Sequence, residues 1–150
     1  MWMDSLLAYL HYIAIFVLVA FLAAEMVLIR GALDPRSIRL LGLVDLVYFG
    51  AAMAALVTGF LRLVYGAKGA HFYLDAWPFY VKFGLFLAVG FISIQPTLTF
   101  IRWRRMLDRD PVWTVPEAAR ARVRRVLLIE VHLAAMIPVF AVVMARGLGR

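Results

Sequence analysis

The chain has 150 residues, of which 65% are hydrophobic and 17% are charged, and its mean hydropathy is +0.90. A water-soluble domain of this length is usually only about half apolar, so the composition argues against a soluble protein and favours one that folds in lipid. Because the sequence contains no cysteine, disulfides, thiolate metal sites and c-type haem attachment are excluded.

Four apolar runs are each long enough to cross a hydrocarbon core of about 30 Å as a helix. They predict membrane spans over residues 6–29, 41–64, 79–101 and 126–145. We therefore expect an all-α fold, a polytopic four-helix transmembrane bundle that occupies residues 1–150 as a single domain. The lipid bilayer is then its main partner.

Local signals between the runs predict how the spans are joined. The first run is longer than the apolar part of a signal peptide and has no Lys or Arg before it, so we expect it to be retained as a span. Asp34 and Pro35 have the order of an N-cap and a first helical residue, which predicts a tight hairpin. Residues 65–78 read as an aromatic interfacial loop. Thr114 and Glu117 have the spacing of a capping box before the fourth span.

Basic residues are distributed unequally between the two sides of the predicted bundle. The loops after the first and third spans hold eleven Lys and Arg residues, whereas the opposite side holds four. Basic loops stay in the cytoplasm, which predicts a bacterial inner-membrane protein with both termini in the periplasm. This placement also explains the net charge of +7, so we expect no nucleic-acid partner.

Ionisable residues inside the spans are costly in lipid, so each is a candidate functional residue. With a rise of about 1.5 Å per residue, they fall into two layers. His11 and Lys82 lie toward the outer side, and Arg62 lies at the outer end of the second span. The polar residues toward the inner side are Glu25, Asp45, Gln95, Glu130 and, nearer the centre, His132.

Each layer also has a structural interpretation. The Lys82 ammonium is close enough to the interface to reach lipid headgroups, and His11 can hydrogen-bond to a neighbouring helix. The acidic residues of the inner layer can form ion pairs with Arg30, Arg39 or Arg102. These interpretations stay open at the level of sequence, and no arrangement of residues predicts a metal site.

Four strings in the sequence resemble a bacterial membrane family classed as domain of unknown function 2214. They are LDPRSIRLLGLVDLVYFGAA, TGFLRLVYGAKGAHFYL, FYVKFGLFLAVGFISIQPTLTFIRWRR and MARG. A more distant resemblance connects the His on the first span and the Lys in KFGLFLAVG with HemJ-type protoporphyrinogen oxidases, and also with CopD-like membrane proteins. That resemblance implies haem b as a cofactor and assigns haem binding and activity to His11 and Lys82.

The leading hypothesis is a haem-binding or quinone-linked redox protein of the HemJ type. In it His11 is an axial ligand or proton acceptor, Lys82 neutralises a porphyrin carboxylate or polarises a substrate group, and Arg62 also binds the cofactor. His11 and His132 differ in height by roughly 15 Å, so they cannot ligate one haem together. The inner residues then form a proton route, through Glu25, Asp45, Gln95, Glu130 and His132.

Two alternatives come from other classes of protein, and whether the chain is an enzyme stays open. One is a structural or assembly subunit of a larger membrane complex, docked through the small-residue ridge Ala51, Ala55 and Gly59 and through the basic cytoplasmic loop. The other is a transporter of an ion or small solute, which uses the inner acidic layer and needs a homo-oligomer to build a pore.

Overall fold

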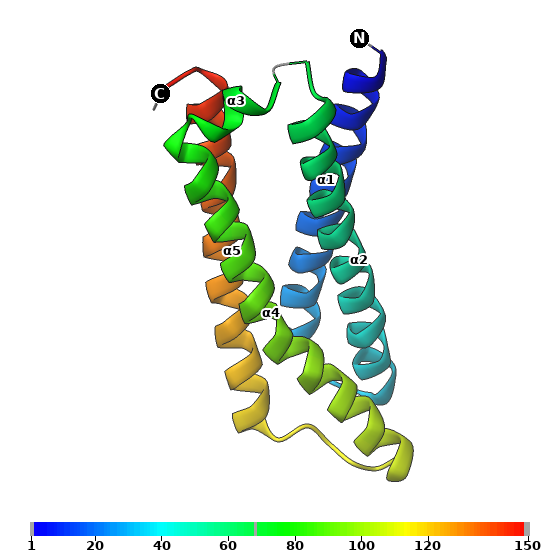
Figure 1. Cartoon of the computed structure of the whole chain (residues 1–150). Coiled ribbons are helices and arrows are strands. Elements are labelled where there is room, and N and C mark those ends of the chain that lie inside the picture. Colours follow the sequence, from blue (N-terminus) through cyan, green and yellow to red (C-terminus); the bar gives the residue numbers. More distant parts are fainter. Residues whose placement is uncertain (1, 68, 149–150) are drawn as a thin grey trace.

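The computed structural model describes residues 2–67 and 69–148, and helices dominate this part of the chain (Figure 1). Each of the four long helices is long and apolar enough to cross a membrane. The long helices are α1 (Trp2–Arg30), α2 (Pro35–Tyr65), α4 (Trp77–Arg109) and α5 (Glu117–Ala145). A short helix, α3 (Gly69–Leu74), lies within the segment that the sequence predicts as a loop. The predicted all-α fold with four spans is confirmed.

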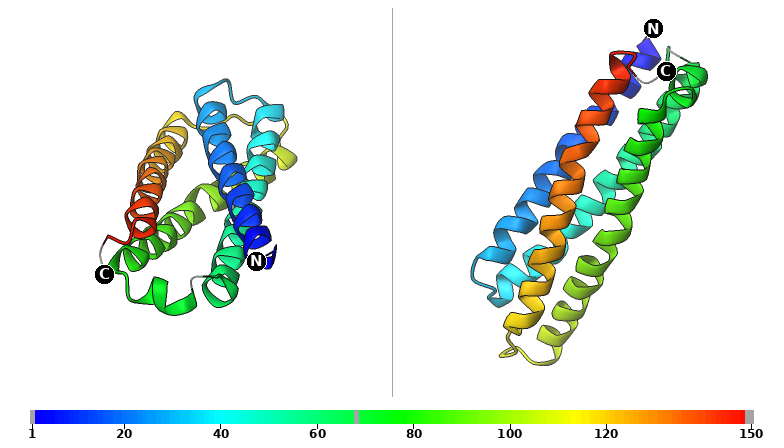
Figure 2. Two further views of the ribbon diagram at one scale, coloured as in Figure 1. Left: turned by 90° about the horizontal axis from the view of Figure 1, so that it is seen from above. Right: turned by 90° about the vertical axis from the view of Figure 1, so that its left-hand side faces the viewer.

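The long helices form two hairpins that pack side by side (Figures 1 and 2). Helix α1 packs along α2 and α4 packs along α5, while the hairpins meet through α2 with α4 and α1 with α5. Both termini and α3 lie at one end of the bundle, which we call the termini end. The α1–α2 and α4–α5 loops lie at the other end, which we call the basic end because most of the arginines lie in the helix ends that these loops join.

The two turns at the basic end begin their following helices differently. Asp34 caps α2 as predicted, since its Oδ1 accepts a hydrogen bond of 2.7 Å from the Ser37 amide and Pro35 follows it. This hydrogen bond holds the pKa of Asp34 below its usual value. Helix α5, in contrast, has Pro116 at its N-cap position and no side-chain cap, so the predicted capping box is wrong. Glu117 instead lies 3.7 Å from Arg120.

Arg120 joins the start of α5 to the end of α1. Its guanidinium donates hydrogen bonds of 2.8–2.9 Å to the backbone carbonyls of Ile29, Arg30 and Gly31. The last carbonyls of a helix have no partner within the helix, so this one side chain satisfies acceptors that are otherwise left open.

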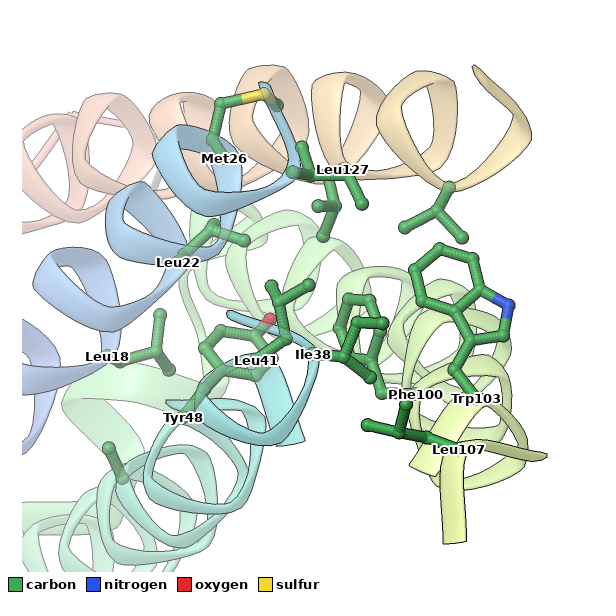
Figure 3. Packing of buried hydrophobic residues seen from close by; sticks show 13 residues of the cluster. Leu18, Leu22, Met26, Ile38, Leu41, Tyr48, Phe100, Trp103, Leu107 and Leu127 are labelled. Carbon is green, nitrogen blue, oxygen red and sulfur yellow. The ribbon is translucent and has the colours of Figure 1, made fainter. Parts of the chain in front are cut away.

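The hydrophobic core occupies the half of the bundle nearest the basic end (Figure 3). Phe100, Trp103 and Leu107 of α4 pack there with Ile38 and Leu41 of α2. All four long helices contribute to this cluster. Burial of these side chains holds the two hairpins together in this half.

Large apolar side chains also cover the outside of the bundle. Phe16, Phe60 and Phe91 are 69%, 63% and 73% exposed. In water such a surface would drive aggregation, but against acyl chains it costs nothing. The exposed surface therefore fits lipid contact, as the composition predicts.

Candidate functional site

His11 is held by a hydrogen bond that determines which of its nitrogens carries the proton. Its Nδ1 lies 3.0 Å from Thr58 Oγ1 on α2. Thr58 Oγ1 lies only 2.6 Å from the Ala54 carbonyl, so the single hydroxyl hydrogen is donated there. The hydroxyl oxygen is then left to accept from Nδ1–H of His11. In the neutral ring, Nε2 is then the nitrogen that keeps a free lone pair.

A glycine on α2 makes room for the imidazole ring. A Cβ atom at Gly59 would lie 3.1 Å from His11 Cε1, closer than ordinary contact. The small-residue ridge that the sequence marks as a docking surface therefore serves packing within the chain. Its other two members, Ala51 and Ala55, are buried as well, with 7% and 4% exposed.

Two cations lie beside His11, and we call His11, Arg62 and Lys82 the basic triad. His11 is within electrostatic reach of both Arg62 and Lys82, and these two cations are within reach of each other. The Arg62 guanidinium lies 5.6 Å from the centre of the Tyr12 ring, and its Nε is buried without a hydrogen-bond partner. The Lys82 ammonium lies 5.6 Å from the centre of the Phe79 ring. No ion pair within residues 2–67 and 69–148 includes a member of the triad.

Three carboxyl groups meet in the other half of the bundle, and we call Glu25, Asp45 and Glu130 the carboxyl cluster. They come from α1, α2 and α5, and they are 1%, 5% and 0% exposed. Glu25 is within electrostatic reach of both other members. Asp45 Oδ1 accepts a hydrogen bond of 2.9 Å from Thr97 Oγ1, so α4 contributes to the cluster too.

The sequence suggests Arg30, Arg39 and Arg102 as ion-pair partners of these acids, but among the described residues none of the three forms an ion pair with the cluster. Arg39 forms an ion pair of 2.8 Å with Asp108, which joins the two hairpins at the basic end. Arg30 and Arg102 are exposed and take part in no ion pair in the described part of the chain. Glu25 Oε1 and both oxygens of Glu130 are buried without a hydrogen-bond partner. The ion-pair interpretation is therefore not what the structure shows.

Gln95 and His132 are the other two inner residues, and neither takes part in the hydrogen bond between Thr97 and Asp45. Gln95 donates to Thr99 Oγ1 at 3.2 Å, and it lines a cavity of about 320 Å³ together with Arg102 and other residues of α4, α5 and their loop. His132 is exposed on α5, where its Nδ1 lies 2.6 Å from the Leu128 carbonyl of its own helix. The structure thus separates His132 from Glu130, two residues before it.

Three further residues with hydroxyl groups belong to these two sites, although the sequence alone does not mark them as functional. Thr58 and Thr97 give no signal, because single hydroxyls are common and inexpensive within helices. Tyr48 is 3% exposed and its hydroxyl approaches Glu130, although Glu130 has no partner of full hydrogen-bonding geometry. Its position three residues after Asp45 places it on the same helix face, which is the signal that could have found it.

Comparisons with known proteins identify a family but no activity. Residues 3–149 match the family model described as "Predicted membrane protein (DUF2214)". No curated protein and no solved structure matches the chain. Within the residues that the structure describes, no group of three or more His, Asp or Glu side chains is arranged to hold a metal ion.

Proposed function

The chain belongs to this family of predicted membrane proteins, and from that premise we propose that it is a haem-binding or quinone-linked redox protein of the HemJ type. The observation that carries the proposal is the His11 ring, held through Nδ1 by Thr58 and lying beside two cations. Haem b combines an iron that accepts an imidazole nitrogen with two carboxylates that attract cations. When bound, it supplies one-electron transfer.

Thr58 would orient His11 to hold a haem iron through Nε2. A metal-binding histidine usually donates its second ring N–H to a fixed acceptor, which sets the tautomer and the direction of the ring. The hydrogen bond from Nδ1 to Thr58 Oγ1 has this character. The same free Nε2 can take up a proton from a substrate, so the ligand and proton-acceptor roles use one atom.

Arg62 and Lys82 supply the charge that an anionic porphyrin needs. Arg62 Nε has no hydrogen-bond partner among residues 2–67 and 69–148, so it is available to donate to a carboxylate or to a quinone carbonyl. Lys82 stands on α4, across the bundle from α2, so the two cations approach a ligand from different hairpins.

The absorption spectrum of the purified protein, before and after addition of haem, tests this function. We expect a Soret band that is lost in His11→Ala and kept in His132→Ala, the matched histidine on an exposed helix face. Lys82→Gln should weaken haem binding by about tenfold, as expected for loss of one charge-assisted contact. A wild-type protein that stays colourless after haem addition contradicts the proposal.

A further inference from the structure

We propose that Glu25, Asp45 and Glu130 form a proton-binding site within the membrane, in which Asp45 carries the one negative charge and the two glutamates hold exchangeable protons. This site is separate from the basic triad. Glu25 follows His11 by 14 residues on α1, which corresponds to a rise of about 21 Å. The inference therefore stands or falls independently of haem.

Burial without partners is the first reason to place protons on the glutamates. Glu130 is 0% exposed, and neither of its oxygens has a hydrogen-bond partner in the described part of the chain. Glu25 is 1% exposed, and its Oε1 also lacks a partner. An ionised carboxylate in such surroundings is neither hydrated nor paired, and proteins avoid this state by keeping the group neutral.

The groups that face the cluster are acidic or neutral, so they do not offset the negative charge of an ionised carboxylate. Helix α1 contributes Glu25, α2 contributes Asp45 and the Tyr48 hydroxyl, and α5 contributes Glu130. Helix α4 contributes only the neutral Thr97 hydroxyl. Because each ionised member repels ionisation of the next, the cluster exchanges its protons one at a time.

One hydrogen bond distinguishes Asp45 from the two glutamates. The Thr97 hydroxyl donates to Asp45 Oδ1 at 2.9 Å. A donor of this kind stabilises a carboxylate more than a carboxylic acid. The single charge of the cluster therefore belongs on Asp45, and the protons belong on Glu25 and Glu130.

A cavity lies between the height of the cluster and the basic end. It is lined by Gln95, Arg102 and Arg122, among others, and has a volume of about 320 Å³. Gln95 precedes Thr97 by two residues on α4, which is a rise of about 3 Å. The cavity therefore reaches the height of the cluster along α4, although Gln95 and Thr97 point to different faces of that helix.

Dicyclohexylcarbodiimide, which modifies protonated carboxyl groups in apolar surroundings, probes this site directly. The protein in lipid nanodiscs is treated at neutral and at alkaline pH, and modified residues are mapped by mass spectrometry. We expect label on Glu25 or Glu130 at neutral pH and its loss at alkaline pH. Glu117, whose side chain is 75% exposed, is the matched control and should stay unlabelled. Absence of label from both buried glutamates, or stronger label on Asp45, overturns the proposal.

Infrared spectroscopy gives a second measurement on the same preparation. The wild-type spectrum should contain the carbonyl band of a protonated carboxyl group, and Glu130→Gln should remove part of it, whereas Glu117→Gln should not. A wild-type spectrum without this band overturns the proposal even if the variant does not fold. Suppression of the labelling by sodium or potassium ions at constant pH would identify a cation site instead. Neither measurement depends on haem.

Discussion

At the scale of single residues, one hydroxyl group determines what His11 can do. Thr58 donates to the backbone of its own helix and so presents only its lone pairs to His11. Without such a fixed partner, a buried histidine can adopt either neutral tautomer. The chemistry that we propose for Nε2 therefore depends on a neutral threonine as much as on the histidine.

Two glycines on α2 test the contact between His11 and that helix. Gly59→Ala places a Cβ atom 3.1 Å from His11 Cε1, whereas a Cβ at Gly50 meets nothing within 4 Å. Replacing a helical glycine by alanine stabilises a helix by up to about 1 kcal/mol. We expect this gain for Gly50→Ala in reversible unfolding in mixed detergent micelles. For Gly59→Ala the displaced ring should cancel it, and equal gains for the two variants would contradict the packing described.

At the scale of elements, the ends of the helices at the basic end depend on side chains from other elements. Asp34 caps α2 from the adjacent loop, which is a local arrangement. The carbonyls at the end of α1, in contrast, are satisfied by Arg120, which lies about ninety residues further along the chain. The first turn of α5 is thus anchored against the end of α1.

Replacement of Arg120 measures how much this anchor contributes. Arg120→Met removes all three hydrogen bonds and leaves backbone carbonyls open, so we expect the free energy of unfolding to fall by about 2 kcal/mol. Arg120→Lys should recover only part of the loss, because an ammonium group cannot reproduce the planar fork of a guanidinium. Arg124→Met, at an exposed position of the same helix, is the control. The prediction fails if the two methionine variants are equally stable.

At the scale of the whole molecule, the bundle separates its internal charges. The basic triad lies in the half nearest the termini, and the carboxyl cluster lies in the half where the hydrophobic core packs. The two groups do not neutralise each other, since roughly 20 Å of apolar helix separates them along α1. In the two proposals made above, each half would bind its own ligand, an anion near the termini and protons near the basic end.

The absence of native cysteine makes the orientation of the bundle directly measurable. Two exposed residues are suitable for replacement by single cysteines. His71 lies in α3 at the termini end, and Thr114 lies in the α4–α5 loop. With the basic loops in the cytoplasm, a membrane-impermeant thiol reagent added to intact cells should label His71→Cys. It should label Thr114→Cys only after the cells are broken. The opposite pattern would show that the termini face the cytoplasm.

The sequence by itself determined the four helices, their membrane character and the height of each polar residue. These follow from apolar run length and from a constant rise along a helix, and both are local properties. Only the tertiary structure decided which of those residues meet. Glu130 and His132 are close in sequence, yet one is buried in the carboxyl cluster and the other faces outward. The partners of Arg39 and Arg120 could not be predicted from the sequence either, because they lie far from these residues along the chain. The reason is physical: height depends on one helix alone, whereas the direction of a side chain depends on how that helix is rotated against its neighbours.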